Sequence, residues 1–85
     1  MNTIWLFYSG AARYECASFP FAFRMMHNAV RKANEAGSSI TNKVSILSPT
    51  KQEYSWVQAS RLATEQGLLT PDGQINGKEF KKKQV

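Results

Sequence analysis

The sequence predicts a small α+β domain in which an antiparallel sheet packs against one main helix. Two strand-like runs within residues 3–17, and further short apolar runs at 43–47 and 53–57, predict the sheet. Apolar residues at helical spacing over 19–36 predict the helix. The 85 residues, of which 42% are hydrophobic, are enough for one modest core. We therefore expect one domain with a single sheet and one dominant helix.

The first element is a predicted β-hairpin over residues 3–17. Thr3–Ser9 is rich in β-branched and aromatic residues, and Gly10-Ala11 then interrupts the run. The alternation that follows should turn Tyr14 and Cys16 toward the core. The alternative is the opposite phase of the same strand, which would turn its charged residues inward.

The main helix is predicted over residues 19–36. Ser18 should cap it by accepting a backbone N–H bond, and Pro20 is tolerated in the first turn. Gly37 stands where a left-handed residue commonly ends a helix. The residues that share one narrow helical stripe, and that we expect in the core, are Phe19, Phe23, Met26, Val30 and Ala33.

Two further strands are predicted after the helix. Lys43–Leu47 is one by its apolar pattern, and Glu53–Val57 is the other, with Ser48–Gln52 as the turn between them. In this interpretation Tyr54 and Trp56 lie on one face of the last strand.

A short second helix is then expected over about residues 60–66, ending at Gly67. The alternative is one long helix over about residues 50–66, because Thr50 and Glu53 have the spacing of a capping box. The sequence favours the strand and short helix, since the aromatic residues here spread around a helical wheel rather than forming one stripe.

The C-terminal part of the chain is predicted to be mostly irregular. Thr70–Gly73 is a strong turn sequence, with proline and glycine at suitable positions. Gln74–Phe80 is either a brief strand or an irregular segment. We therefore expect the globular domain to span residues 1–77, with residues 78–85 as a basic, disordered tail.

The positive charge is concentrated in that tail. The net charge is +5, and four lysines and one glutamate among the last eight residues contribute +3 of it. Only +2 remains for the other 77 residues. The body of the domain is therefore much less basic than the total charge indicates, which weakens the case that it binds nucleic acid.

Composition and motifs argue against several kinds of chemistry. A chain this short has little room for both a core and a deep substrate cleft, so we expect a non-enzyme without a small-molecule substrate. One cysteine and one histidine, Cys16 and His27, cannot supply a structural zinc site, and no glycine-rich phosphate-binding motif or other cofactor signature is present. The lone cysteine favours a reducing compartment, hence the cytoplasm, and no apolar run reaches membrane-spanning length.

One aromatic residue on the main helix does not belong to the core stripe. Phe21 projects about 160° from the centre of the stripe, on the basic side of the helix. Either the hairpin or the C-terminal segment covers its ring, or the ring is partly exposed and binds a partner. In the second case the predicted partner-binding residues are Phe21, Arg24, Met25, Asn28, Arg31 and Lys32.

Two functions remain open. The first is a small protein-interaction module, such as an inhibitor, adaptor or regulatory subunit of the kind that viruses often encode. Its partner would be a larger cytoplasmic protein or a second copy of the chain, and Phe21→Ala should abolish binding. The second is a nucleic-acid-binding accessory protein, whose predicted phosphate contacts are Arg24, Arg31, Lys32, Lys78, Lys81, Lys82 and Lys83. The low charge of the body favours the first.

Overall fold

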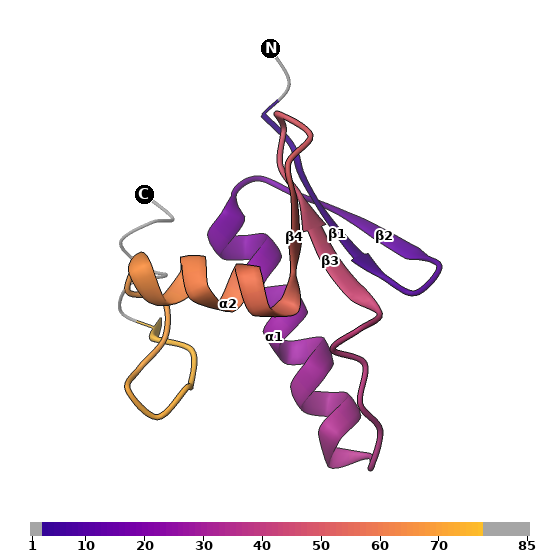
Figure 1. Cartoon of the computed structure of the whole chain (residues 1–85), viewed down its shortest axis with the longest axis vertical. Coiled ribbons are helices and arrows are strands. Elements are labelled where there is room, and N and C mark those ends of the chain that lie inside the picture. The colour runs from indigo at the N-terminus through magenta and orange to yellow at the C-terminus, as the bar shows by residue number, and fades with distance from the viewer. Residues whose placement is uncertain (1–2, 78–85) are drawn as a thin grey trace.

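A computed structural model describes residues 3–77 of the chain and confirms the predicted α+β fold (Figure 1). A four-stranded antiparallel sheet packs against one long helix, and a shorter helix follows the last strand. The predicted tail, 78–85, lies outside the described residues. In chain order the elements are β1 Trp5–Ser9, β2 Ala12–Cys16, α1 Phe19–Glu35, β3 Val44–Leu47, β4 Glu53–Ser55 and α2 Trp56–Glu65.

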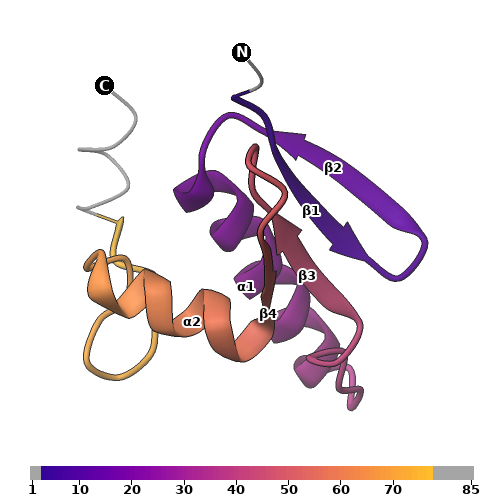
Figure 2. The ribbon, with the colours of Figure 1, turned by 45° about the horizontal axis from the view of Figure 1, so that its top comes forward.

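The strand order of the sheet is β2-β1-β3-β4, so the first hairpin and the second hairpin join through β1 and β3. Helix α1 lies across one face of the sheet and packs on β1, with β2 and β3 to either side of it. Figure 2 shows β2 as the outermost strand, at the edge remote from α2. This arrangement leaves β2 as an edge strand beside α1.

The first hairpin forms over the predicted residues because its turn suits its sequence. Gly10 has a φ of 60°, the value that the first central residue of a type II′ turn requires. The turn pairs Ser9 with Ala12 and continues the register to Trp5 and Cys16. Tyr14 and Cys16 share the face that meets α1, as the alternation predicted.

Helix α1 has the predicted core stripe, but only one of its two predicted caps is found. Gly37 has a φ of 83° and ends the helix, because the backbone N–H groups of Gly37 and Ser38 donate to the carbonyls of Asn34 and Ala33. At the other end Ser18 is the cap residue, yet its hydroxyl makes no capping bond and is buried without a hydrogen-bond partner among residues 3–77. The predicted Ser18 side-chain cap was therefore wrong.

The core lies between α1 and the inner face of the sheet. Phe23, Met26 and Ala22 of α1 are fully buried, as are Ile46 of β3 and Leu68 after α2. Four members of the predicted stripe are buried, and the fifth, at the C-terminal end of α1, is partly exposed. Burial of this apolar surface is the main stabilising contribution to the fold.

The second helix begins earlier than the sequence predicted. Strand β4 ends at Ser55, and Ser55 then caps α2 through a capping box with Gln58. The predicted boundaries, a strand to Val57 and a helix from residue 60, were wrong because this box takes precedence over the strand-like alternation of Tyr54 and Trp56. The alternative of one long helix is excluded, since β4 pairs with β3.

The segment after α2 folds back onto α1. The predicted turn at Thr70–Gly73 is confirmed by a hydrogen bond of 2.9 Å from the Gly73 N–H to the Thr70 carbonyl. Leu69 and Ile75 form a single antiparallel bridge, which is all the strand pairing that the described part of residues 74–80 contains. Within residues 3–77 neither helix has both the length and the apolar character needed to cross a membrane.

Candidate functional site

Strand β2 presents a free main-chain edge. Among residues 3–77, β2 pairs only with β1. In a two-residue hairpin the closing pair is hydrogen-bonded, and the bonding side then alternates along the strand. Ala12, Tyr14 and Cys16 therefore direct their N–H and C=O groups toward β1, whereas Arg13 and Glu15 direct theirs away from the sheet.

A groove runs along this free edge, between β2 and α1. It consists of two adjoining hollows of about 400 and 320 Å³ that share Met25 and Asn28. Cys16 and Phe21 line the first hollow, and Tyr14 lines the second. We call this feature the β2 groove; the other residues that line it are Phe7, Ser9, Glu15, Ala17, Arg24, Ala29 and Lys32.

The floor of the β2 groove is apolar and its rims are charged. Phe21 and Met25 are half-buried and pack against the core. Tyr14 stacks on Phe7 with ring centroids 5.8 Å apart, yet it is 45% exposed. Arg24 and Lys32 on α1 supply positive charge. Aromatic and methionine side chains with arginine at the rim are the composition favoured at protein-binding surfaces.

Cys16 is part of the packing in the groove rather than a reactive group. The side chain is 7% exposed, and its Sγ donates to the Sδ of Met25 at 3.5 Å. Burial raises the pKa of the Cys16 thiol, which disfavours the thiolate needed for nucleophilic attack. This agrees with the prediction that the alternation of this strand turns Cys16 toward the core.

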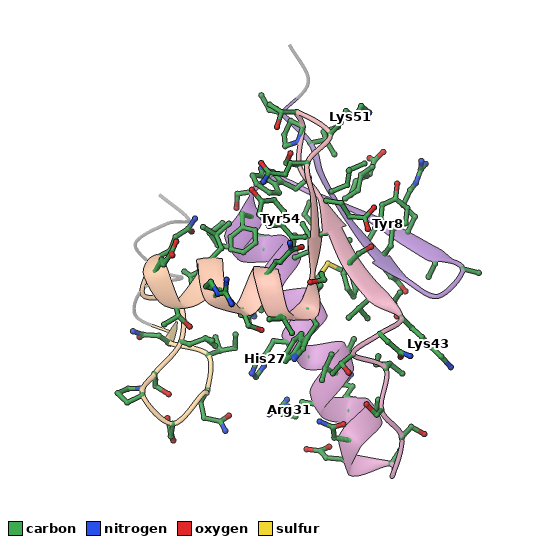
Figure 3. All side chains as sticks on the ribbon, viewed as in Figure 1. Tyr8, His27, Arg31, Lys43, Lys51 and Tyr54 are labelled. Carbon is green, nitrogen blue, oxygen red and sulfur yellow. The ribbon has the colours of Figure 1, made fainter. Side chains whose placement is uncertain are left out.

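The structure brings together five of the six predicted partner-binding residues. Phe21, Arg24, Met25 and Asn28 line one hollow, and Lys32 lines the adjoining one. Arg31 does not belong to this groove. Figure 3 shows Arg31, with His27, on the side of α1 that is turned away from β2. There they line a more polar hollow with Arg24, Asn28, Gln74 and Ile75, and this hollow adjoins the β2 groove through Arg24 and Asn28.

The single histidine has a structural position. The Nε2 atom of His27 lies 3.2 Å from the Gly73 carbonyl oxygen, so Nε2 carries the proton and donates it. The ring also packs against Phe23 and Trp56, with centroids 6.0 and 6.3 Å away. His27 thereby joins α1 to α2 and to the turn at Gly73. Within the described part of the chain no three His, Cys, Asp or Glu side chains gather into a group suited to a metal ion.

Sequence reasoning missed the contribution of β2 to this surface. Arg13, Tyr14 and Glu15 were assigned to a strand but not to a binding site, because their edge position depends on which strands pair. The sequence did contain one signal of an edge strand, because the charged residues Arg13 and Glu15 lie on either side of Tyr14. Comparison of the chain with models of known protein families, with curated protein sequences and with solved structures found no match.

Proposed function

We propose that this chain is a non-enzymatic protein-interaction module, of the inhibitor, adaptor or regulatory-subunit kind, acting in the cytoplasm. It binds an extended protein segment along the free edge of β2 and in the β2 groove. The main support is one juxtaposition: the main-chain groups of Arg13 and Glu15, which no strand within residues 3–77 pairs with, lie beside an apolar groove lined by Phe21 and Met25.

This geometry suits strand addition. An extended segment beside β2 gains main-chain hydrogen bonds at Arg13 and Glu15, and its alternate side chains point toward α1. Tyr14 and Cys16 are two residues apart on β2, and each lines one of the two hollows. Successive inward-pointing side chains of the added strand, about 7 Å apart, would therefore enter the two hollows in turn. Main-chain bonds supply affinity in this mode, and the hollows supply selectivity.

Nucleic-acid binding is the competing function. The positions of the basic side chains support it less well than they support protein binding. Arg31 and Lys32 line different hollows on α1, and the predicted lysine contacts in the tail lie outside the described residues. A phosphate-binding surface needs several cations along one path. The hollow lined by Arg31 contains one further arginine, Arg24, next to the partly buried His27.

A matched pair of variants separates the two functions. Met25→Glu places a charge in the β2 groove, whereas Arg31→Glu changes the neighbouring hollow, which Met25 does not line. The tagged chain is used to capture proteins from nuclease-treated lysate of the cells that produce it, and a labelled 20-base-pair DNA duplex is titrated in parallel. We expect nuclease-resistant capture of one protein that Met25→Glu abolishes and Arg31→Glu retains. Salt-sensitive binding of the duplex that Arg31→Glu weakens and Met25→Glu retains would contradict the proposal.

A further inference from the structure

We propose that the strand that pairs with β2 comes from a second copy of this chain. Two β2 strands would align antiparallel about a two-fold axis through Tyr14 and join two four-stranded sheets into one continuous sheet. This inference rests on the proposed function, because it names the occupant of the same edge and groove. Three independent features of β2 support it.

The first feature is the direction of the main-chain groups. Among the five residues of β2, Ala12–Cys16, only Arg13 and Glu15 direct N–H and C=O groups toward the free edge. In an antiparallel pair centred on Tyr14, Arg13 of one copy stands opposite Glu15 of the other. Both residues of that pair have outward-pointing groups, so each pair exchanges two hydrogen bonds. Tyr14 then faces Tyr14 of the second copy as a non-hydrogen-bonded pair.

The second feature is charge. In this register Arg13 of each copy lies directly opposite Glu15 of the other, on the outer face of the sheet. Directly opposed unlike charges stabilise an antiparallel pair, and like charges destabilise it. The two nearest registers that keep the hydrogen-bonding pattern place Arg13 opposite Arg13, or Glu15 opposite Glu15. The charges therefore select the register centred on Tyr14.

The third feature is the β2 groove. A two-fold axis perpendicular to the sheet keeps both α1 helices on the same face, so the two grooves meet at the axis. Because α1 packs on β1, the two helices would lie about 14 Å apart, which is three strand spacings. Directly packed helices are about 8–10 Å apart, so there is room between them for side chains. Tyr14, Phe21 and Met25 of both copies would fill it.

Charge-reversal variants test the register. Arg13→Glu gives a strand with two negative charges, and Glu15→Arg gives a strand with two positive charges. We expect the wild-type chain to dimerise with rising concentration in sedimentation velocity up to about 1 mM, as a small interface implies. Each single variant should associate at least tenfold more weakly on its own. An equimolar mixture of the two should associate again, because every opposed pair is then of opposite charge.

The mixture also controls for misfolding, since an unfolded variant would not regain association on mixing. The double variant Arg13→Glu/Glu15→Arg restores both pairs and should dimerise like the wild type. A wild-type chain that stays monomeric over the whole concentration range would overturn the inference. So would a mixture of the single variants that associates no better than either variant alone.

A disulfide tests the position of the axis. Paired non-hydrogen-bonded residues in antiparallel strands have Cα atoms about 4.5 Å apart, within the range that a disulfide bridges. Tyr14→Cys, in a Cys16→Ala background, should therefore crosslink two copies rapidly under mild oxidation. Arg13→Cys in the same background is the matched control, because residue 13 does not face itself and should crosslink slowly.

Equal crosslinking of the two cysteine variants would overturn the register. The proposed function can fail separately from this inference. If the chain is monomeric and yet captures a different protein in a way that Met25→Glu abolishes, the second copy is refuted as occupant while the protein-binding groove is supported. If neither self-association nor Met25-dependent capture is found, both are refuted.

Discussion

Two phenylalanines two positions apart on α1 should have opposite roles, and alanine substitution separates them. Phe23 is 0% exposed, and its ring lies between three others: Phe19, His27 and Trp56, with centroids 5.9, 6.0 and 6.3 Å away. Phe21 is only half-buried and lines the β2 groove. The first ring therefore belongs to the core, and the second lies at its margin beside the proposed interface.

The expected magnitudes follow from this burial. Phe23→Ala leaves a cavity among rings from α1 and α2, and such changes cost about 3–5 kcal/mol of unfolding free energy. A small domain has a total stability of only about 5–15 kcal/mol, so Phe23→Ala should leave it marginal. Phe21→Ala removes a half-buried ring and should cost roughly 1–2 kcal/mol.

Urea denaturation followed by circular dichroism measures both losses, and sedimentation velocity measures the association. We expect Phe21→Ala to retain a cooperative transition while it weakens binding in the β2 groove. Phe23→Ala should lower the urea midpoint far more. Equal losses of stability, or unchanged association in a folded Phe21→Ala variant, would refute the division of roles between the two rings.

Three further predictions concern the caps, the cysteine and the histidine. Ser55→Ala should lower the unfolding free energy by about 1 kcal/mol because Ser55 caps α2 in a capping box. Ser18→Ala should be neutral or stabilising, because the buried Ser18 hydroxyl has no partner within the described part of the chain. The urea midpoints of the two variants compare these effects. Burial raises the pKa of the Cys16 thiol above its unfolded value, so the unfolded chain loses this proton first. The unfolding free energy should therefore fall as the pH rises past about 8.5, less so in Cys16→Ala, and pH-dependent urea titrations check this. Nitrogen-15 NMR should find a proton on Nε2 of His27, and a ring without a proton on Nε2 would contradict the bond to Gly73.

The fold class could be predicted because its signals are local. The hairpin depends on Gly10 between two strand-like runs, and the end of α1 depends on Gly37 at a left-handed position. The start of α2 was missed because two local signals compete there. Tyr54 and Trp56 alternate like a strand, while Ser55 and Gln58 form a capping box whose bonds begin the helix.

The candidate site could be predicted only in part, because it combines local and long-range structure. The helical wheel separates Phe21 and Met25 from the core stripe, and the structure places both beside β2. Which strand lies at the edge of the sheet beside them depends on the pairing of β1 with β3, in which Phe7 stands opposite Ile46, a residue far away in the sequence. That pairing makes β2 an edge strand, and single-strand patterns carry no information about strand order.

Amide hydrogen exchange along β2 tests most directly whether an added strand binds at this edge. Within β2 the N–H groups of Ala12, Tyr14 and Cys16 point toward β1, whereas those of Arg13 and Glu15 point to the free edge. In the dilute, unbound chain Arg13 and Glu15 should therefore exchange much faster than Tyr14. A complex is formed either by raising the concentration of the chain or by adding a protein that the chain captures. In the complex, the amide exchange of Arg13 and Glu15 should slow to approach that of Tyr14. Association that leaves Arg13 and Glu15 exchanging as fast as before would contradict strand addition at β2.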